Sequence, residues 1–247
     1  MNITSWFRRL STIALSILLS LTIFIAPANA LVLDKIVTEN YETLRKTNAC
    51  VNCDLSGVDL SEQDLYGAAL AGANLSNANL SGSLLRQANL EKATLKGANL
   101  SNALLRGSEL SEATLIGADL YHANLSNTNM NKANLTGAIL TEANLESAII
   151  LGANLSNAVV KSAKLQGAIL SGSDLLNADF SSSKMRNTKL SNANLRCTNF
   201  YAADLLNSLM PDGTTYNGNV SGFKACQAEK GCKIQIPDLC PPRESIP

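Results

Sequence analysis

The sequence predicts an all-β solenoid, and a repeat of five residues is the observation that leads to this fold class. From Leu55 to Met210 every position divisible by five carries a large apolar residue, which is Leu in most of the repeats. Two residues before each of them the chain almost always has Ala, Ser or Thr, and no insertion breaks the phase. Aromatic residues make up only 4% of the 247 residues, so the core has to be built mostly from Leu and Ala. A period of five matches neither a helix nor a strand, whose periods are about 3.6 and 2.

Square coils account for this period. If every five residues form one side and turn a corner, four sides make a coil of about 20 residues, and successive coils stack about 4.8 Å apart like strands of a sheet. The large residue then fills the interior, and the residue two before it must be small because it points inward as well. The repeats from Leu55 to Met210 predict about eight coils and a column roughly 38 Å long. A single coil cannot enclose its own Leu side chains, so stacking provides the core.

The repeat units resemble a known family. Ala73-Asn74-Leu75-Ser76-Asn77 and Ala118-Asp119-Leu120 are similar to the A(D/N)LXX motif of the pentapeptide repeat family. The resemblance covers residues 53–210 and implies a right-handed quadrilateral β-helix. The segments Cys50–Gly57 and Met210–Thr214 are similar to the entry and exit segments of exported cyanobacterial and thylakoid-lumen members. Membership of such a family implies a fold and leaves the activity open.

Residues 1–30 are predicted to be a secretory signal peptide. Arg8 and Arg9 give a positive start, 13–25 is an apolar stretch, and Ala28–Ala30 has the A-x-A form of a cleavage site. A transmembrane anchor is the alternative, but a helix of that length rises only about 20 Å, short of the ~30 Å hydrocarbon core. We therefore expect export to the periplasm or the thylakoid lumen, with no stable membrane insertion after cleavage.

Both ends of the repeat region, 53–210, should be covered, because exposed sheet edges invite aggregation. Residues 31–52 are predicted to form an N-terminal cap with a short helix over 34–48. Residues 211–247, rich in Gly, Pro and Cys, are predicted to form a C-terminal cap. The helix is indicated by four apolar residues near helical spacing: Ile36, Val37, Tyr41 and Leu44.

The cysteines are predicted to form structural disulfides, as is usual in an oxidising compartment. The six candidates are Cys50, Cys53, Cys197, Cys226, Cys232 and Cys240. The first two lie at one end of the coils and the other four at the opposite end, farther apart than the ~6 Å Cα separation that a disulfide allows. Full oxidation thus implies Cys50–Cys53 and one of three pairings among the rest. A redox-active C-x-x-C and a zinc site are the alternatives, but this C-x-x-C opens a coil rather than a helix and no His joins the other four.

Composition argues against several classes of function. The chain has 20 Lys and Arg against 20 Asp and Glu, so no excess positive charge is available for nucleic acid. His122 is the only His and stands at a corner position, which rules out a Ser-His constellation or a multi-His metal site. Glu91 and Glu109 form the densest group of carboxylates, but they alternate with Lys on a convex side where no cleft is expected. We predict no catalytic residue, no metal, no cofactor and no enzymatic activity.

Outward-facing residues in coils five to seven are the candidate interaction patches. Large apolar residues on a solvated lattice suggest contact with another molecule, although the β-propensity of Ile and Val also accounts for them. The apolar candidates are Ile149, Leu151 and Ile169 on one side and Ile139 and Val159 on the opposite side. The basic candidates form a strip between these sides, Lys164, Lys184 and Arg186, with Lys189 around the corner. A solvated face is the alternative for the basic strip.

These observations favour an exported, non-enzymatic scaffold or protein-interaction module. Its partner is predicted to be an unidentified protein or a second copy of the chain, and not nucleic acid. Two alternatives remain. Some members of the family imitate DNA and protect gyrase, but that role needs a strongly acidic, cytosolic protein, whereas this chain is neutral. A disulfide- or redox-linked lumenal factor is the other alternative.

Overall fold

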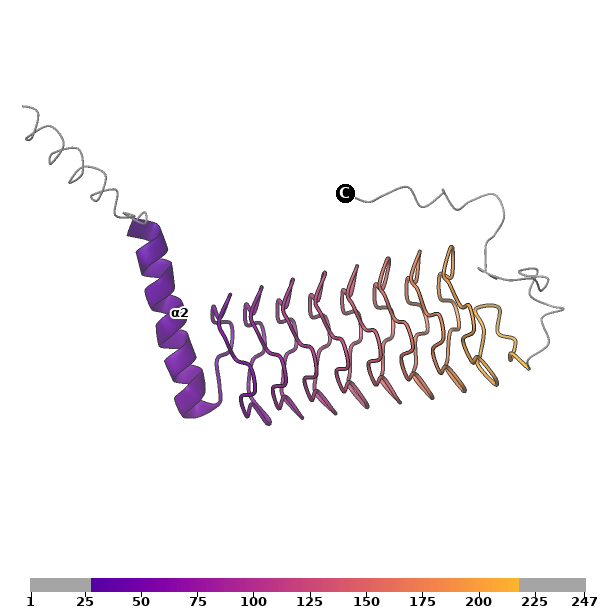
Figure 1. The fold of residues 1–247 in the computed structure, drawn as a ribbon, viewed down its shortest axis with the longest axis horizontal. Helices are drawn as coiled ribbons and strands as arrows, with labels where there is room; N and C mark the ends of the chain where they lie inside the picture. The colour runs from indigo at the N-terminus through magenta and orange to yellow at the C-terminus, as the bar shows by residue number, and fades with distance from the viewer. Residues whose placement is uncertain (1–27, 218–247) are drawn as a thin grey trace, which may run out of the picture. The chain divides into compact units, whose positions relative to one another are not determined.

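The computed structural model describes residues 28–217, which form two units with a boundary between residues 39 and 40. The predicted signal peptide lies almost entirely outside these residues, and so does most of the predicted C-terminal cap. Figure 1 shows helix α2 followed by a regular stack of coils. Within the described range, no helix combines the length and apolar character that a membrane span requires.

Helix α2 runs from Ala28 to Thr47 and so begins earlier than the helix predicted over 34–48. The residue after its end, Asn48, has a left-handed φ of 54°, and the backbone N–H of Asn48 donates to the carbonyl of Leu44 at 2.8 Å. Asn is one of the few residues that adopts this conformation readily, which makes it a common helix terminator. The last two turns, residues 40–47, belong to the second unit.

These last turns of α2 pack on the first coil. Leu44 is almost fully buried, and Tyr41 packs against the same core. The side-chain amide of Asn40 donates to the carbonyl of Asp54 at 2.9 Å, and that of Asn48 donates to the carbonyl of Tyr66 at 2.8 Å. Backbone carbonyls of a terminal coil have no preceding coil to pair with, so these two amides satisfy groups that would otherwise be left to solvent.

The repeat region is a β-helix in which each coil lies in register with the next. Parallel bridges join each residue at an outward position to its counterpart four units later in the chain, from Ala49 with Ala69 to Lys189 with Leu209. Each bridge joins a single residue of one coil to a single residue of the next. Strands of more than one residue do not occur among the described residues. The register confirms the predicted square coil, because four units of five make one full turn.

Each corner is a turn that needs one left-handed residue. In the unit from Leu65 to Ala68, the N–H of Ala68 donates to the carbonyl of Leu65 at 3.0 Å, and Gly67 between them has a φ of 64°. A positive φ only at the third residue defines a type II turn. The equivalent residue has a positive φ in every unit from Asn52 to Asn207, and Gly or Asn is common there.

The interior is built as the repeat predicts. The inward Leu and Ala side chains of the middle coils are inaccessible to solvent. In the later coils, Ser and Thr replace several Ala, and their hydroxyls donate to carbonyls of the preceding coil, as Ser183 does to Val160 at 2.6 Å. Here the core also becomes aromatic: Phe180 and Phe200 stack with their ring centres 5.6 Å apart. Gln63, at an inward position of the first coil, is exposed, since no earlier coil encloses it.

After the last coil the chain reverses. Leu209 and Thr215 form an antiparallel bridge, and the N–H of Tyr216 donates to the carbonyl of Ser208 at 2.8 Å. Gly213, with a φ of 83°, allows the tight turn between them. The chain thus pairs back on part of the final edge before residue 218.

Candidate interaction surface

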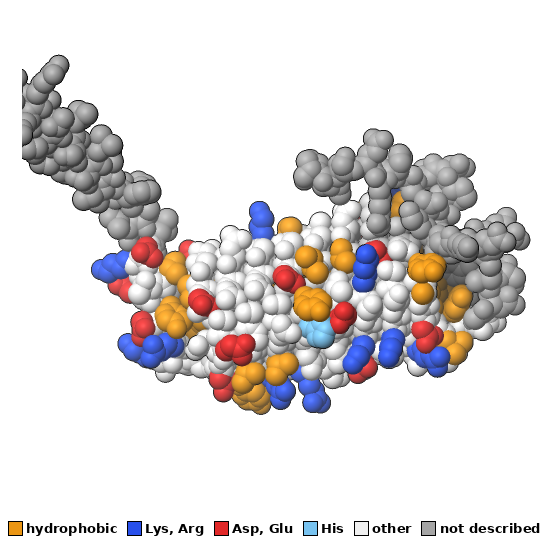
Figure 2. All heavy atoms as spheres, in the orientation of Figure 1, with side chains coloured by type: hydrophobic (Ala, Val, Ile, Leu, Met, Phe, Trp, Pro, Cys, Tyr) orange, Lys and Arg blue, Asp and Glu red, His pale blue; other side chains and the backbone are white. Residues whose placement is uncertain are grey.

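The isoleucine ladder, which we define as Ile149, Leu151 and Ile169, lies on one side of coils five and six. Ile149 and Ile169 are bridge partners, so their side chains are neighbours along the coil stack. Leu151 stands at the adjoining corner, and 39% of its surface is exposed, against 37% for Ile149. The structure therefore brings the three predicted residues together on the surface. Figure 2 shows apolar side chains in small groups among charged ones on one face of the coils.

The ladder replaces a hydrogen bond that most units make. At the outward position, an Asn or Asp side chain usually accepts the N–H of the residue two later, as Asn129 does from Asn131 at 3.2 Å. Ile149 cannot accept this bond. The N–H of Leu151 instead donates to the side chain of Asn131 in the preceding coil, also at 3.2 Å. Sequence reasoning missed this role of Asn131, which only the stacking of coils reveals.

Ile139 and Val159 do not join this ladder. They are bridge partners of each other, with Asp119 before and Asp179 after them in the same row. Two sides of the square separate them from Ile149, as predicted. Although Ile139 is 42% exposed, this pair lies between two acidic residues and forms a separate patch.

The basic strip is partly neutralised. Lys164 and Lys184 are bridge partners, and the next residue in that row is Asp204. Arg186 forms an ion pair with Asp204, and its hydrogen bond lowers the pKa of this carboxyl group. Among the described residues, Lys164, Lys184 and Lys189 have no ion pair. Lys189 is bridged directly to Ile169 and therefore extends the isoleucine ladder with a positive charge.

A buried carboxylate lies at the end of the other apolar pair. Asp179 is only 7% exposed. Burial raises its pKa, but hydrogen bonds from the Ser181 hydroxyl and N–H and the charge of Lys161, 3.4 Å away, outweigh burial, so the pKa is lowered overall. The structure thus keeps Asp179 ionised, with its partners supplied by the nearest corner.

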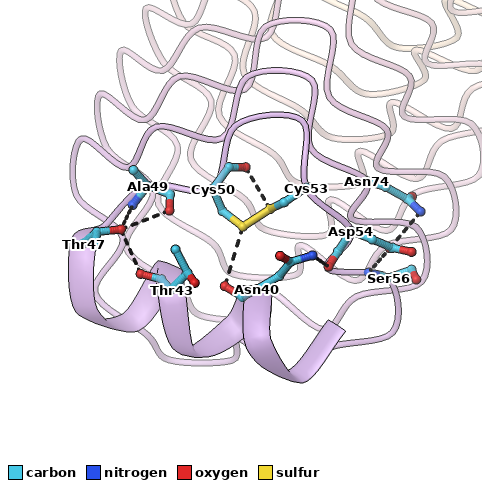
Figure 3. Close-up of a disulfide and its surroundings, with 9 residues drawn as sticks. All are labelled: Asn40, Thr43, Thr47, Ala49, Cys50, Cys53, Asp54, Ser56 and Asn74. Atoms are coloured by element: carbon cyan, nitrogen blue, oxygen red, sulfur yellow. Dashed lines mark hydrogen bonds between the residues drawn. A yellow bond between two sulfur atoms is a disulfide. The ribbon is translucent and has the colours of Figure 1, made fainter. Parts of the chain in front are cut away.

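Cys50 and Cys53 are bonded at the start of the first coil. Their Cα atoms are 5.5 Å apart, and the Sγ of Cys50 lies 3.6 Å from the carbonyl of Asn40 in α2 (Figure 3). Cys197, in the eighth coil, is disulfide-bonded as well. The remaining candidates, Cys226, Cys232 and Cys240, lie outside the described residues.

The only His and one of the two Glu residues considered for catalysis form ion pairs in the described part of the chain. His122 pairs with Glu142, its neighbour one coil later, and its ring also contacts Tyr121. Lys92 pairs with Glu91 at 2.9 Å. In residues 28–217 no three potential metal-ligating side chains are grouped together.

The comparisons with known proteins agree on the repeat. The family model for pentapeptide repeats matches eight copies over residues 53–91, 83–120, 108–146, 138–177 and 173–209. No curated protein matches the chain.

Three solved structures illustrate what the chain is similar to. HetL, a pentapeptide repeat protein involved in heterocyst differentiation regulation in Nostoc sp. strain PCC 7120, is 27% identical over 73% of this chain and 98% of its own, with a TM-score of 0.29. A pentapeptide repeat protein from the Arabidopsis thaliana thylakoid lumen is 35% identical over 40% of this chain and 70% of its own, with a TM-score of 0.32. QnrB1, a plasmid-mediated fluoroquinolone resistance protein, is 23% identical over 63% of this chain and 80% of its own, with a TM-score of 0.37.

These superpositions are partial, so the assignment depends on the repeat itself. The matched segments run from residue 53 to residue 209, well over half of the sequence. The bridges between successive coils give the four-sided turn that these repeats form. The chain belongs to the pentapeptide repeat family and folds as its right-handed β-helix solenoid.

Proposed function

We propose that this protein is an exported, non-enzymatic scaffold that binds a partner protein through the isoleucine ladder. The observation that carries the proposal is the exchange at Ile149 and Ile169. Both stand where other units use Asn or Asp to close the corner, and both place an apolar side chain there, exposed at Ile149 and half-buried at Ile169. Asn131 of the preceding coil accepts the N–H at the Ile149 corner in place of the missing side chain, so the exchange keeps that hydrogen bond and leaves apolar surface that a partner would cover.

A protein surface is the partner that fits the ladder best. Fully burying an Ile or Leu side chain contributes about 1.5–3 kcal/mol, so covering the remaining exposed part of three such residues contributes a few kcal/mol. Lys189, next to Ile169 in the row, adds a positive charge at the rim of the patch. An apolar centre with a polar rim is the usual arrangement of a specific protein interface.

Export is part of the proposal because of two features in the N-terminal part of the chain. Residues 1–30 have the composition of a signal peptide. The bond between Cys50 and Cys53 would persist in an oxidising compartment, as in the periplasm or the thylakoid lumen. The test is fractionation of cells that express the full chain, followed by N-terminal sequencing. A mature start at Leu31 in an exported fraction supports export, and an intact Met1 in the cytosol refutes it.

The interaction is tested with a triple variant, Ile149→Ser, Leu151→Ser and Ile169→Ser. These side chains point out of the coils, so the far-UV circular dichroism should stay unchanged. Affinity capture from the protein's own compartment and light scattering should lose the partner or the dimer that the natural chain shows.

The control is the double variant Ile139→Ser and Val159→Ser on the opposite side, which also removes outward-facing apolar side chains and should keep the partner. If the triple variant retains the same partners and the same oligomeric state as the natural chain, the ladder is not an interface.

A further inference from the structure

A shallow depression of about 480 Å³ lies in the first four coils, on the same corner as Arg186 of the basic strip but in earlier coils, and on a different corner from the isoleucine ladder. It extends from the first coil to the fourth, which is about 14 Å along the stack at 4.8 Å per coil. Six residues line it: Tyr66, Arg86, Gln87, Arg106, Gly107 and Asn127.

Two arginines form the centre of the depression. Arg86 and Arg106 are separated by four units and therefore occupy the same corner in consecutive coils, as the hydrogen bond from the N–H of Gln87 to the carbonyl of Arg106 shows. Among residues 28–217, neither guanidinium group has an ion pair or a hydrogen bond. Like charges placed side by side on a β lattice repel each other. An anion between the two groups would remove this repulsion and gain charge-assisted hydrogen bonds from both.

Neutral donors surround the arginines. The hydroxyl of Tyr66 donates to the side-chain carbonyl of Gln87 at 2.6 Å, which leaves the amide nitrogen of Gln87 to donate elsewhere. The amide of Asn127 lies at the far end of the depression. Gly107, directly after Arg106, has no side chain and keeps the floor open. Donors of both kinds thus face the same space, and no acceptor side chain of comparable charge lines it.

An apolar border distinguishes the depression from a simple anion site. Leu84 and Leu104 are bridge partners on the adjoining side, each two residues before one of the arginines. Leu84 is 38% exposed. At about 3.3 Å per residue, a length of about 14 Å accommodates four extended residues. A ligand that fills this space has both a carboxylate and an apolar side chain within a few residues.

We propose that this depression binds an extended acidic peptide segment, with one carboxylate held between Arg86 and Arg106 and an apolar side chain on Leu84 and Leu104. Guanidinium groups suit this role because their planar donors match both oxygens of a carboxylate. This site is independent of the isoleucine ladder, which lies in later coils. The two can therefore succeed or fail separately.

The test is an NMR titration of the ¹⁵N-labelled full chain with the peptide acetyl-Leu-Asp-Leu-Asp-amide. Saturable shifts should appear at the backbone amide of Gly107 and at the side-chain amides of Gln87 and Asn127, with a Kd below about 5 mM. The peptide with Asn in place of both Asp should bind at least tenfold more weakly. Absence of saturable shifts at 10 mM peptide, or equal binding of the Asn peptide, overturns the proposal.

Variants separate the site from general attraction to a positive surface. Arg86→Gln combined with Arg106→Gln should weaken binding at least tenfold, whereas Arg196→Gln, at an exposed corner on a different side, should change it less than twofold. The serine triple variant of the ladder should bind the peptide normally. Inorganic phosphate should compete only weakly. Competition by phosphate as strong as that by the peptide would mean that a simple anion site is present and would refute recognition of a peptide.

Discussion

Substitutions at neighbouring positions in one column of the core should have strongly non-additive effects on the free energy of unfolding. Val160, Phe180 and Phe200 follow one another at intervals of one coil in a column where every earlier residue from Leu60 to Leu140 is Leu. The first two are inaccessible to solvent, and their coils are joined by a hydrogen bond of 2.7 Å from the N–H of Val160 to the carbonyl of Asp179. We infer that the small Val160 makes room for the large Phe180.

The magnitudes follow from packing. Val160→Leu adds a methylene beside an aromatic ring and should destabilise by about 1–3 kcal/mol through overpacking. Phe180→Leu leaves space beside Val160 and loses the stacking on Phe200, which contributes about 0.5–1.5 kcal/mol beyond burial. The double variant restores the Leu-on-Leu packing of the earlier coils, so its loss should be smaller than the sum of the single losses by about 1.5 kcal/mol, within the range measured for residues in contact.

The assay is urea unfolding of the four proteins of this cycle, followed by far-UV circular dichroism with intact disulfides. Because each coil contacts only its neighbours, amide hydrogen exchange at Val160 and Phe180 adds a local measure. The changes in unfolding free energy caused by substitutions at distant, independent sites add within about 0.3–0.5 kcal/mol. If the two substitutions are additive within that range, Val160 and Phe180 are not packing partners and the size compensation is wrong.

Three further predictions address the core, the charges and the disulfide. Leu135→Asp should destabilise by more than about 4 kcal/mol, because it buries an unpaired carboxylate at a fully enclosed position, while Leu135→Met should cost less than about 1.5 kcal/mol in urea unfolding. The pKa of Asp179 is lowered in the folded state, so the ionised carboxylate contributes its full stabilisation above pH 3.8, and this contribution is lost as the pH falls through the folded-state pKa. Asp179→Asn should therefore flatten that part of the acid unfolding curve. An unchanged curve would contradict this. Reduction of the Cys50–Cys53 bond should speed amide hydrogen exchange in the first coil and leave the middle coils unchanged. The change in the first coil should correspond to about 2 kcal/mol, the loop-closure entropy of this disulfide. Equal protection of the first coil before and after reduction would exclude this local role.

The sequence predicts the fold well because, in a β-helix, the five-residue period of the sequence also sets the register between successive coils. Once five residues turn one corner, residue 74 has to lie beside residue 94, and the bridges show this throughout. The length of α2 was predicted less well. Apolar spacing begins only at Ile36, whereas the helix already includes Ala28 and continues to Thr47.

The left-handed corner residue was not predicted from the sequence, since its identity varies. Lys132 and His122 occupy it with a φ of 56° and 57°, although such residues adopt this conformation at a cost. At some corners a larger residue would displace a side chain of the preceding coil, and at others it would not. A Cβ added to Gly72 would lie 2.0 Å from the side-chain oxygen of Asn52, whereas one added to Gly117 would meet nothing within 4 Å.

The candidate surfaces were predicted as rows, but their ion pairs were not. The spacing places Lys92 in line with Glu112, yet the shorter contact of Lys92 is with its chain neighbour Glu91, at 2.9 Å against 4.0 Å. In the same way Arg186 lies near the lysines in sequence but pairs with Asp204. A five-residue pattern specifies where a side chain begins, and the rotamers of long side chains decide which charge it reaches.

The residue type at the outward position before each inward residue helps to distinguish a binding surface from a residue chosen only for its β-propensity. The fold itself favours Asn or Asp there, because these side chains close the corner with a hydrogen bond. Thr94 and Thr114 also lack a carboxamide or carboxylate, but Thr satisfies the β-propensity of the position and keeps a polar group toward water. Ile149 with Ile169, and Leu84 with Leu104, offer neither the corner hydrogen bond nor a hydroxyl. β-Propensity accounts for Ile in the first pair, as it does for Ile139 with Val159, but it does not favour Leu in the second, so Leu84 and Leu104 are the pair that the lattice leaves unexplained. Both pairs lie beside a positive charge that has no ion pair among the described residues, and the contacts that we propose with a partner and with an acidic peptide would account for apolar surface at these two places.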